Sequence, residues 1–168
     1  MDESGCNLNY PLCKMWMKRG EQKRLSVHGK SRAGTSLVGV LNWYNEKVYC
    51  EELERLSGQG LTEFFERLLL EVYPTQRIVL VMDNASYHHS QDVQAMLSIF
   101  EERLMVLWLP PYSPDLNLIE RFWKHLKQNV CANHLYASLK HMLQAVFEEI
   151  RLQNCPDYPY RLDFSKNL

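Results

Sequence analysis

Two apolar runs, residues 77–82 (RIVLVM) and 104–109 (LMVLWL), constrain the fold of this chain more than any other feature. Short continuous runs of this kind are typical of strands that are buried on both faces of a sheet. A segment with apolar residues at helical spacing follows each run, over residues 93–100 and 116–130. The repeated order of strand and helix predicts an α/β domain whose helices cover a sheet.

The other segments add antiparallel strands and two more helices to this plan. Three of them have strand character: residues 25–28, 36–43 and 47–50. Two carry apolar residues at helical spacing: residues 60–72, which Pro74 ends, and residues 139–150. Tyr44, Asn45 and Glu46 suit a hairpin turn between the last two of the three strands. We therefore predict an α/β fold with a mixed sheet flanked by helices.

Length and composition predict a single globular domain. A chain of 168 residues with 46% hydrophobic and 23% charged residues is ordinary for a soluble protein with one core. From Asn154 onward the chain has two prolines and no periodicity, so we place the domain at residues 1–153 and an irregular tail at residues 154–168. No apolar run approaches the roughly 20 residues that a membrane helix needs.

Cysteine usage and net charge exclude several classes of protein. The five cysteines are odd in number and form no CxxC pair, which argues against a disulfide framework or a zinc knuckle and favours a reducing compartment. The formal net charge of −1 argues against a general nucleic-acid coat, which is strongly basic. A nuclease stays possible because active-site carboxylates lower the net charge and DNA affinity can come from local patches.

Asp83 is the first candidate for chemistry, because it directly follows the run at residues 77–82 and precedes Asn84. The carboxyl ends of strands are where open α/β sheets place their sites. The alternative is that Asp83 opens a turn or caps the next helix, and strand geometry alone does not decide between the two.

Glu120 is the second candidate, one turn into a helix for which Asp115 is a good N-cap. The same helix face carries Lys124 and Lys127, so an ordinary solvated Glu–Lys pair is the alternative. The preceding loop contains three prolines and returns the chain from a buried strand to the sheet end where Asp83 is expected. We therefore expect Glu120 and Asp83 to approach each other.

Neither the histidines nor the first acidic residues identify a metal by themselves. His88 and His89 lack the i, i+4 spacing of a zinc helix. Asp2 and Glu3 lie at the start of the chain, where acidic residues are usually solvated. Carboxylate ligands favour Mg²⁺ or Mn²⁺.

Three motifs resemble one family, the mariner-like DDE transposases and their bacterial insertion-sequence relatives. Residues 81–88 (VMDNASYH) resemble its strand followed by DNAxxH, and residues 109–120 (LPPYSPDLNLIE) resemble its LPPYSPDLNPIE motif. Residues 2–5 (DESG) resemble the motif of its first aspartate. Leu118 stands where the family motif usually has proline.

The resemblance implies an RNase H-like fold with Asp2, Asp83 and Glu120 as the catalytic, metal-binding triad. It also implies two Mg²⁺ or Mn²⁺ ions, cleavage of DNA at transposon ends, strand transfer into target DNA, and a homodimer. Candidate substrate contacts are Asn84, His88, Lys124 and Lys127. The expected location is the cytoplasm with the bacterial nucleoid, or the nucleus in a eukaryote.

The chain departs from the family at its start, because only Met1 precedes Asp2. Family members carry an N-terminal helix-turn-helix region and several apolar residues before the first aspartate, which form the central strand. We therefore expect a truncated first strand. Three interpretations stay open: an active transposase catalytic domain, an inactive or domesticated fragment that acts in DNA binding or assembly, and a different RNase H-like nuclease.

Overall fold

The computed structural model describes residues 1–9, 13–22, 24, 33–53, 56–111, 113 and 116–164. Its strands are β1 (Asp2–Asn7), β2 (Gly34–Asn42), β3 (Lys47–Leu53), β4 (Ile78–Met82) and β5 (Leu104–Trp108). Its α-helices are α1 (Gly58–Arg67), α2 (Gln91–Ile99), α3 (Leu118–Leu126) and α4 (Leu139–Gln153). Short helical turns in the described segments join them: the π-helical η1 (Leu68–Val72) and η4 (Lys127–Cys131), and the 3-10 turn η2 (Ser86–His89). None of these helices is long and apolar enough to span a bilayer.

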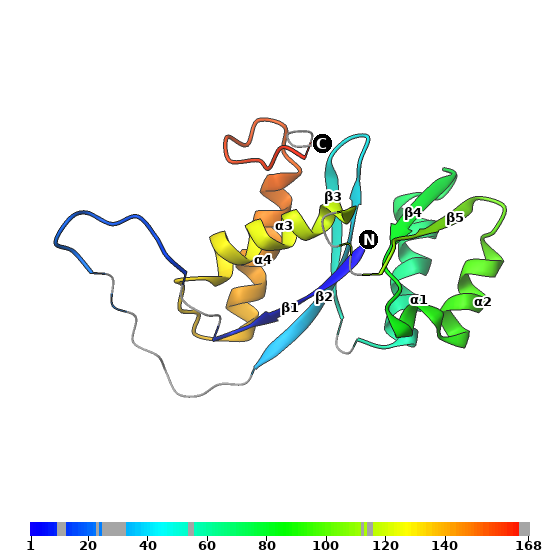
Figure 1. The fold of residues 1–168 in the computed structure, drawn as a ribbon, viewed down its shortest axis with the longest axis horizontal. Coiled ribbons are helices and arrows are strands. Elements are labelled where there is room, and N and C mark those ends of the chain that lie inside the picture. Colours follow the sequence, from blue (N-terminus) through cyan, green and yellow to red (C-terminus); the bar gives the residue numbers. More distant parts are fainter. Residues whose placement is uncertain are drawn as a thin grey trace.

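The first three strands form an antiparallel sheet in the order β1-β2-β3, at the centre of the molecule (Figure 1). The predicted hairpin is confirmed, since β2 and β3 pair from Asn42 opposite Lys47 onward. The side chain of Asn42 accepts hydrogen bonds from the backbone amides of Tyr44 and Asn45, which fixes the turn. The strand expected at residues 25–28 lies outside the described residues.

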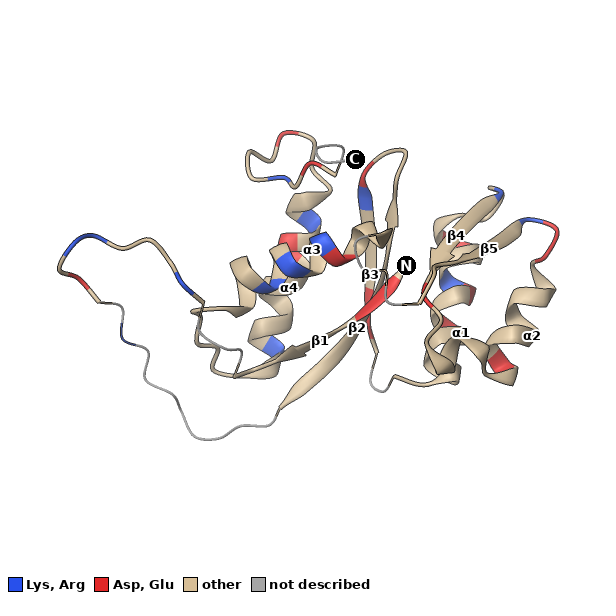
Figure 2. Ribbon diagram, in the orientation of Figure 1, with Lys and Arg blue, Asp and Glu red and all other residues tan. Residues whose placement is uncertain are grey.

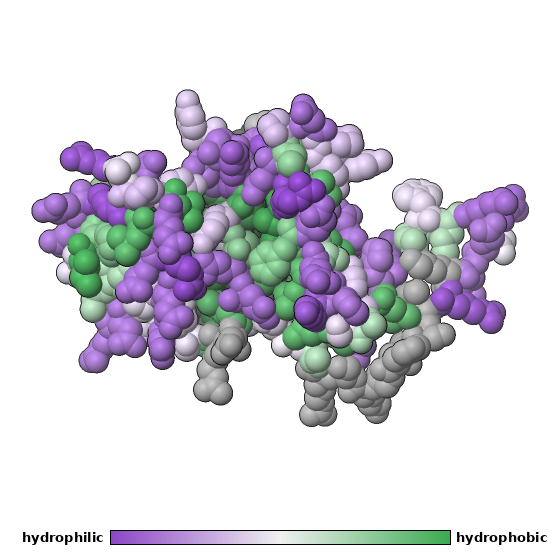
Figure 3. Space-filling view, turned by 180° about the vertical axis from the view of Figure 1, so that it is seen from behind, coloured by the Kyte–Doolittle hydropathy of each residue, from purple (hydrophilic) through white to green (hydrophobic). Residues whose placement is uncertain are grey.

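β4 and β5 form a second, parallel sheet, with Ile78 opposite Leu104. The two apolar runs are therefore strands as predicted, but the expectation that both of their faces are buried is wrong. Val79, Met105 and Leu107 are 59%, 60% and 49% exposed, because α1 and α2 pack on the opposite face. Seen from behind, apolar patches interrupt the hydrophilic surface at this end of the molecule (Figure 3).

Two hydrophobic cores lie on opposite faces of the three-stranded sheet. Successive residues of a strand point to opposite faces, so Leu37 belongs to the core under α3 and α4, whereas Val38 belongs to the core with α1, α2 and β4. α3 approaches β2 closely at Gly39, where a Cβ atom would lie 2.9 Å from the ring of Trp123. The central sheet therefore holds both halves of the molecule together.

Serine side chains begin three of the helices. Ser90 accepts a hydrogen bond from the amide of Val93, and Ser57 and Ser138 cap α1 and α4 in the same way. The expected cap of α3, Asp115, lies outside the described residues. The structure has Asn117 at the N-cap position of that helix, with no side-chain cap bond.

The segment after α4 has turns but no helix or strand as far as the described residues extend, to Phe164. Arg121 of α3 donates hydrogen bonds to the carbonyl oxygens of Asp163 and Phe164 at 3.3 and 3.2 Å. The Phe164 side chain is fully buried in the core under α3 and α4. This segment therefore packs against α3.

Candidate active site

The three predicted carboxylates lie at the junction of β1, β4 and α3. Asp2 is the first residue of β1, Asp83 directly follows β4, and Glu120 is in the first turn of α3. In Figure 2 the ribbon is red, the colour of acidic residues, at the start of β1 next to the amino terminus. Three elements that are distant in sequence thus each bring one carboxylate to the same region.

Met1 joins these elements through both of its backbone groups. Its amino group donates a hydrogen bond to the carbonyl oxygen of Val81 in β4, at 2.7 Å. Its own carbonyl oxygen accepts a hydrogen bond from Nδ2 of the buried Asn117, at 3.2 Å, just before α3. The start of β1 is therefore held against the end of β4 and the start of α3.

The pKa of Asp2 responds first to burial and then to the neighbouring acidic residues. The pKa of the Asp2 carboxyl is raised to about 6, chiefly by burial. A backbone hydrogen bond from Glu3 opposes the shift, and the negative charges of Glu3, Glu120 and Asp83 add to it. Like charges raise a carboxyl pKa only at close range, so the site concentrates negative charge. Such a site suits a divalent cation, and carboxylate oxygens are the ligands that Mg²⁺ and Mn²⁺ prefer.

The side chains do not converge into a ready-made metal cage. Within the described ranges, no three His, Cys, Asp or Glu side chains are close enough together to hold one ion. The Asp83 side chain is 49% exposed and Glu120 is exposed, so both can be reached from solvent. The arrangement therefore has the right donors in one region without the final ligand geometry.

His88 lies between two carboxylates instead of on the surface. Its Nε2 atom lies 3.0 Å from Oε1 of Glu3, and its Nδ1 atom lies 3.1 Å from Oδ1 of Asp83. The imidazole is fully buried. Burial lowers the pKa of His88, but the hydrogen bond and charge of Glu3 outweigh this, so the net shift is upward. A direct contact of His88 with substrate would require one of these bonds to break.

Glu3 is a site residue that the sequence did not identify. Besides His88, it accepts a hydrogen bond from the hydroxyl of Tyr87 at 2.8 Å, and its side chain is only 5% exposed. Burial, with this bond and the charge of Glu3, raises the pKa of Tyr87 well above its usual range. The one available signal was strand alternation, which directs Glu3 away from Asp2 and toward the opposite face of β1.

The other candidate substrate contacts have different surroundings. Asn84 donates a hydrogen bond from Nδ2 to the carbonyl oxygen of Leu109 at 2.6 Å, which joins the ends of β4 and β5. Lys124 is exposed on α3, and Lys127 is half-buried where α3 passes into η4. A contact of any of these three with DNA stays a prediction.

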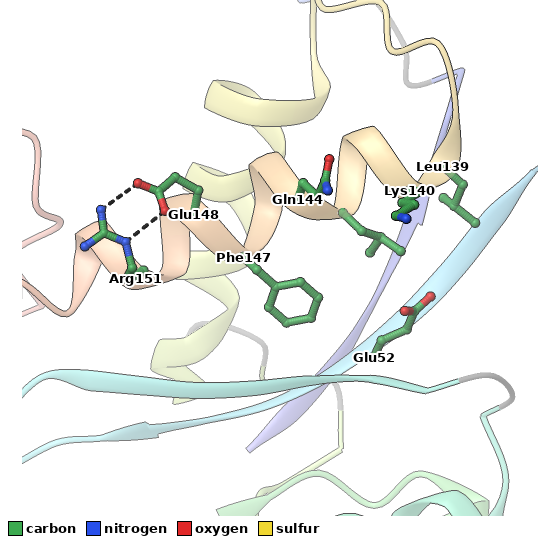
Figure 4. A pocket seen from close by; sticks show the side chains of 8 residues that line it. Glu52, Leu139, Lys140, Gln144, Phe147, Glu148 and Arg151 are labelled. Atoms are coloured by element: carbon green, nitrogen blue, oxygen red, sulfur yellow. Dashed lines mark hydrogen bonds and ion pairs between the residues drawn. The ribbon is translucent and has the colours of Figure 1, made fainter.

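A larger hollow of about 700 Å³ lies away from the carboxylates, between β3 and α4. Figure 4 shows Glu52 on β3 with its carboxylate toward Lys140 of α4, and the ion pair of Glu148 and Arg151 farther along the same helix. None of the candidate site residues lines it. This hollow is therefore separate from the junction at Asp2.

Known proteins share this sequence pattern and this fold. The family profile described as DDE superfamily endonuclease matches residues 1–143. The chain is 30% identical over 145 residues to the insertion element IS630 uncharacterized 39 kDa protein of Shigella sonnei, which covers 86% of this chain and 42% of that protein. The chain thus spans less than half the length of this curated relative.

Solved structures of Mos1 transposase have a similar fold. The Mos1 paired-end complex with left transposon end gives a TM-score of 0.67 at 20% identity, covering 89% of this chain and 46% of that chain. The catalytic domain of Mos1 mariner transposase gives 0.60 at 20% identity, covering 74% and 65%. That domain has also been solved with Mg and with Mn. The predicted RNase H-like fold is confirmed, and the chain belongs to the DDE superfamily of endonucleases that its three motifs resemble.

Proposed function

We propose that this chain is the catalytic part of a transposase that cuts DNA at transposon ends and transfers the freed strand into target DNA. The observation that carries the proposal is the junction of β1, β4 and α3, where the bonds of Met1 hold together the three elements that carry Asp2, Asp83 and Glu120. Membership in the DDE superfamily of endonucleases supports the same reaction class.

In this proposal Asp2, Asp83 and Glu120 hold two Mg²⁺ or Mn²⁺ ions. Two such ions about 4 Å apart activate the nucleophile and stabilise the leaving oxygen in phosphodiester chemistry. Asp83 is oriented for this role by the amide of Ala85, which donates to its Oδ1 atom at 3.0 Å, and by His88. Asp2 is oriented by the backbone bonds of Met1.

The partners in this proposal are DNA and a second copy of the chain. Mos1 has been solved in complexes with transposon-end DNA, which supports a DNA substrate for this fold. Recognition of particular ends requires a DNA-binding region such as a helix-turn-helix. The exposed Lys124 is a candidate phosphate contact, because lysine side chains commonly bind DNA phosphates.

Substitution of single carboxylates tests the proposal. Asp83→Asn and Glu120→Gln keep the shape of each side chain and remove a ligand charge. We expect each to lower Mn²⁺ affinity, measured by calorimetry with the ion alone, at least about ten-fold. We also expect each to abolish Mn²⁺-dependent cleavage of the DNA that flanks the coding sequence. Glu101→Gln, in the turn before β5, is the matched control and should change neither. Unchanged ion affinity in both site variants would place the ions elsewhere.

A second candidate is an inactive or domesticated module that acts only in DNA binding or assembly. The absence of a converged ligand cluster in the described residues favours it. This candidate predicts DNA binding without Mn²⁺ binding and without cleavage. The same calorimetric titration therefore separates the two functions.

A further inference from the structure

The carboxylate of Asp83 is held at one of its two oxygens and open at the other. Its Oδ1 atom accepts a hydrogen bond from the amide of Ala85 at 3.0 Å and lies 3.1 Å from Nδ1 of His88. A carboxylate oxygen has two acceptor positions, so these two contacts occupy Oδ1. Within the described segments, no hydrogen bond or ion pair involves Oδ2, and the side chain is 49% exposed. Oδ2 is therefore the oxygen that an ion can reach.

His88 is fixed in this position by contacts on several sides. Its Nδ1 atom donates a hydrogen bond to the backbone carbonyl oxygen of Asp83 at 3.0 Å. The backbone of His88 donates to the carbonyl oxygen of Ala85 at 3.0 Å and accepts a hydrogen bond from Nε2 of Gln94 at 2.9 Å. The ring of Tyr87 packs edge-on against the imidazole, with the ring centroids 4.6 Å apart. A shift of the imidazole would therefore break several contacts at once.

Glu3 holds the other side of the imidazole. Its Oε1 atom lies 3.0 Å from Nε2 of His88, and its Oε2 atom accepts a hydrogen bond from the hydroxyl of Tyr87 at 2.8 Å. Both carboxylate oxygens of Glu3 are thus engaged, and the side chain is 5% exposed. Although Glu3 follows Asp2 directly in the sequence, its carboxylate acts on the site through His88 and not as a ligand.

We propose that Glu3 and His88 are positioning residues that leave Asp83 a single oxygen, Oδ2, for an ion and thereby favour Mg²⁺ or Mn²⁺ over Ca²⁺. The inference rests on the proposed function, because it concerns the ions that Asp83 holds there. Mg²⁺ requires nearly ideal octahedral geometry, whereas Ca²⁺ takes about six to eight oxygens and often both oxygens of one carboxylate. A carboxylate limited to one oxygen suits the first ion and weakens the binding of the second.

Four single substitutions separate the two ends of this series of contacts. His88→Asn keeps a side-chain amide near the place of Nδ1 and removes the contact with Glu3. His88→Gln keeps an amide near the place of Nε2 and removes the contact with the Asp83 side chain. Glu3→Gln keeps the shape of the side chain and removes its charge. The matched control is His125→Gln, because His125 also lies beside a carboxylate, Oε1 of Glu149 at 3.3 Å.

The first measurement uses the metal-free chain and follows how Asp83 is held. Hydrogen exchange of the Ala85 amide reports the bond of this amide to Oδ1. We expect the amide to exchange about ten-fold faster in His88→Gln and about three-fold faster in Glu3→Gln, with no change in His125→Gln. An unchanged exchange rate in His88→Gln and Glu3→Gln would overturn the positioning role, whether or not the chain binds ions.

The second measurement titrates each variant by calorimetry with Mn²⁺ alone and with Ca²⁺ alone. We expect His88→Gln and Glu3→Gln to lower the ratio of Mn²⁺ affinity to Ca²⁺ affinity about ten-fold, and His88→Asn to lower it less than about three-fold. A merely structural role would weaken the binding of both ions together and leave this ratio unchanged, which would overturn the proposal. If His88→Gln does not fold, the ratio in Glu3→Gln decides in the same way.

The double variant tests whether Glu3 acts through His88. Glu3→Gln should change the affinity ratio no further when it is combined with His88→Gln. A full additional effect of Glu3→Gln in the double variant would make Glu3 a ligand and overturn its positioning role. If the unsubstituted chain binds neither ion, the proposed function fails, and the exchange of the Ala85 amide still decides how Asp83 is held.

Discussion

Glu3 and His88 form a buried pair that reaches from β1 to the turn after β4. Oε1 of Glu3 lies 3.0 Å from Nε2 of His88, and the other ring nitrogen faces Asp83 at 3.1 Å. Because Glu3 follows Asp2 in the strand, the pair connects two of the three candidate carboxylates. The positions of Asp2 and Asp83 are therefore coupled through one imidazole.

Glu3→Gln should lower the free energy of unfolding by about 1–3 kcal/mol, the usual cost of disturbing a buried hydrogen bond. The folded-state pKa of His88 is raised, so this pair adds stability below the ordinary histidine value of 6.5. That contribution is lost as the pH rises through the raised pKa. The decrease in unfolding free energy caused by Glu3→Gln should therefore be largest near pH 6 and smaller at higher pH. Urea unfolding across this range measures it, with Glu66→Gln on the exposed face of α1 as the control.

Asp2 should make the metal-free protein less stable as the pH rises from about 4 to about 6. Its pKa is raised from 3.8 to about 6, so the folded state holds this proton more tightly than the unfolded chain does. Asp2→Asn should flatten that part of the pH profile of the melting temperature. Because an ion competes with the proton, we also expect Mn²⁺ to stabilise the protein more at pH 7.5 than at pH 5. Equal stabilisation at both values would contradict the role of Asp2 as a ligand.

Asn117→Ala removes the bond between α3 and the carbonyl oxygen of Met1. Since this carbonyl is buried and would lose its partner, we expect a loss of about 1–3 kcal/mol in unfolding free energy. Asn129→Ala, an exposed asparagine of η4, is the matched control and should cost less than about 0.5 kcal/mol. Similar losses in the two variants would show that the Met1 bond does not hold α3 in place.

Gly39→Ala and Gly5→Ala give opposite expectations within the central sheet. A Cβ atom at Gly39 would lie 2.9 Å from Cη2 of Trp123 and 3.2 Å from the carbonyl oxygen of Tyr49, so we expect destabilisation of about 1–3 kcal/mol. A Cβ atom at Gly5 meets nothing within 4 Å, and the lower chain entropy of alanine should stabilise the protein by about 0.5 kcal/mol. Thermal unfolding of both variants measures the two effects.

Helices and strands could be predicted because the spacing of apolar residues that indicates each one lies within a single short segment. Ser90 illustrates this, since a cap followed by apolar residues at helical spacing needs no tertiary information. The burial of β5 could not be predicted in the same way. Whether a second layer covers Met105 and Leu107 depends on where the helices pack, and both packed on the other face.

The sequence motifs identified the three candidate carboxylates but not the contacts that surround them. Asp2, Asp83 and Glu120 could be named in advance, but the bonds of Met1 and Asn117 that bring their elements together are long-range contacts between backbone and side chain. The buried environment of His88 likewise depends on Glu3, 85 residues earlier in the chain. Sequence spacing carries no information about such pairings.

The separation into two cores has a consequence for the order of folding. β4, α2 and β5 form a continuous stretch that follows α1, and they share one core with it, so these contacts close over short chain distances. α3 must instead dock onto strands more than 70 residues earlier, such as β2 at Gly39. Elements with local contacts form early and long-range docking comes late. The three carboxylates lie at the boundary between these stages, so the candidate site should form last in folding and be disturbed first on heating, before either core has melted.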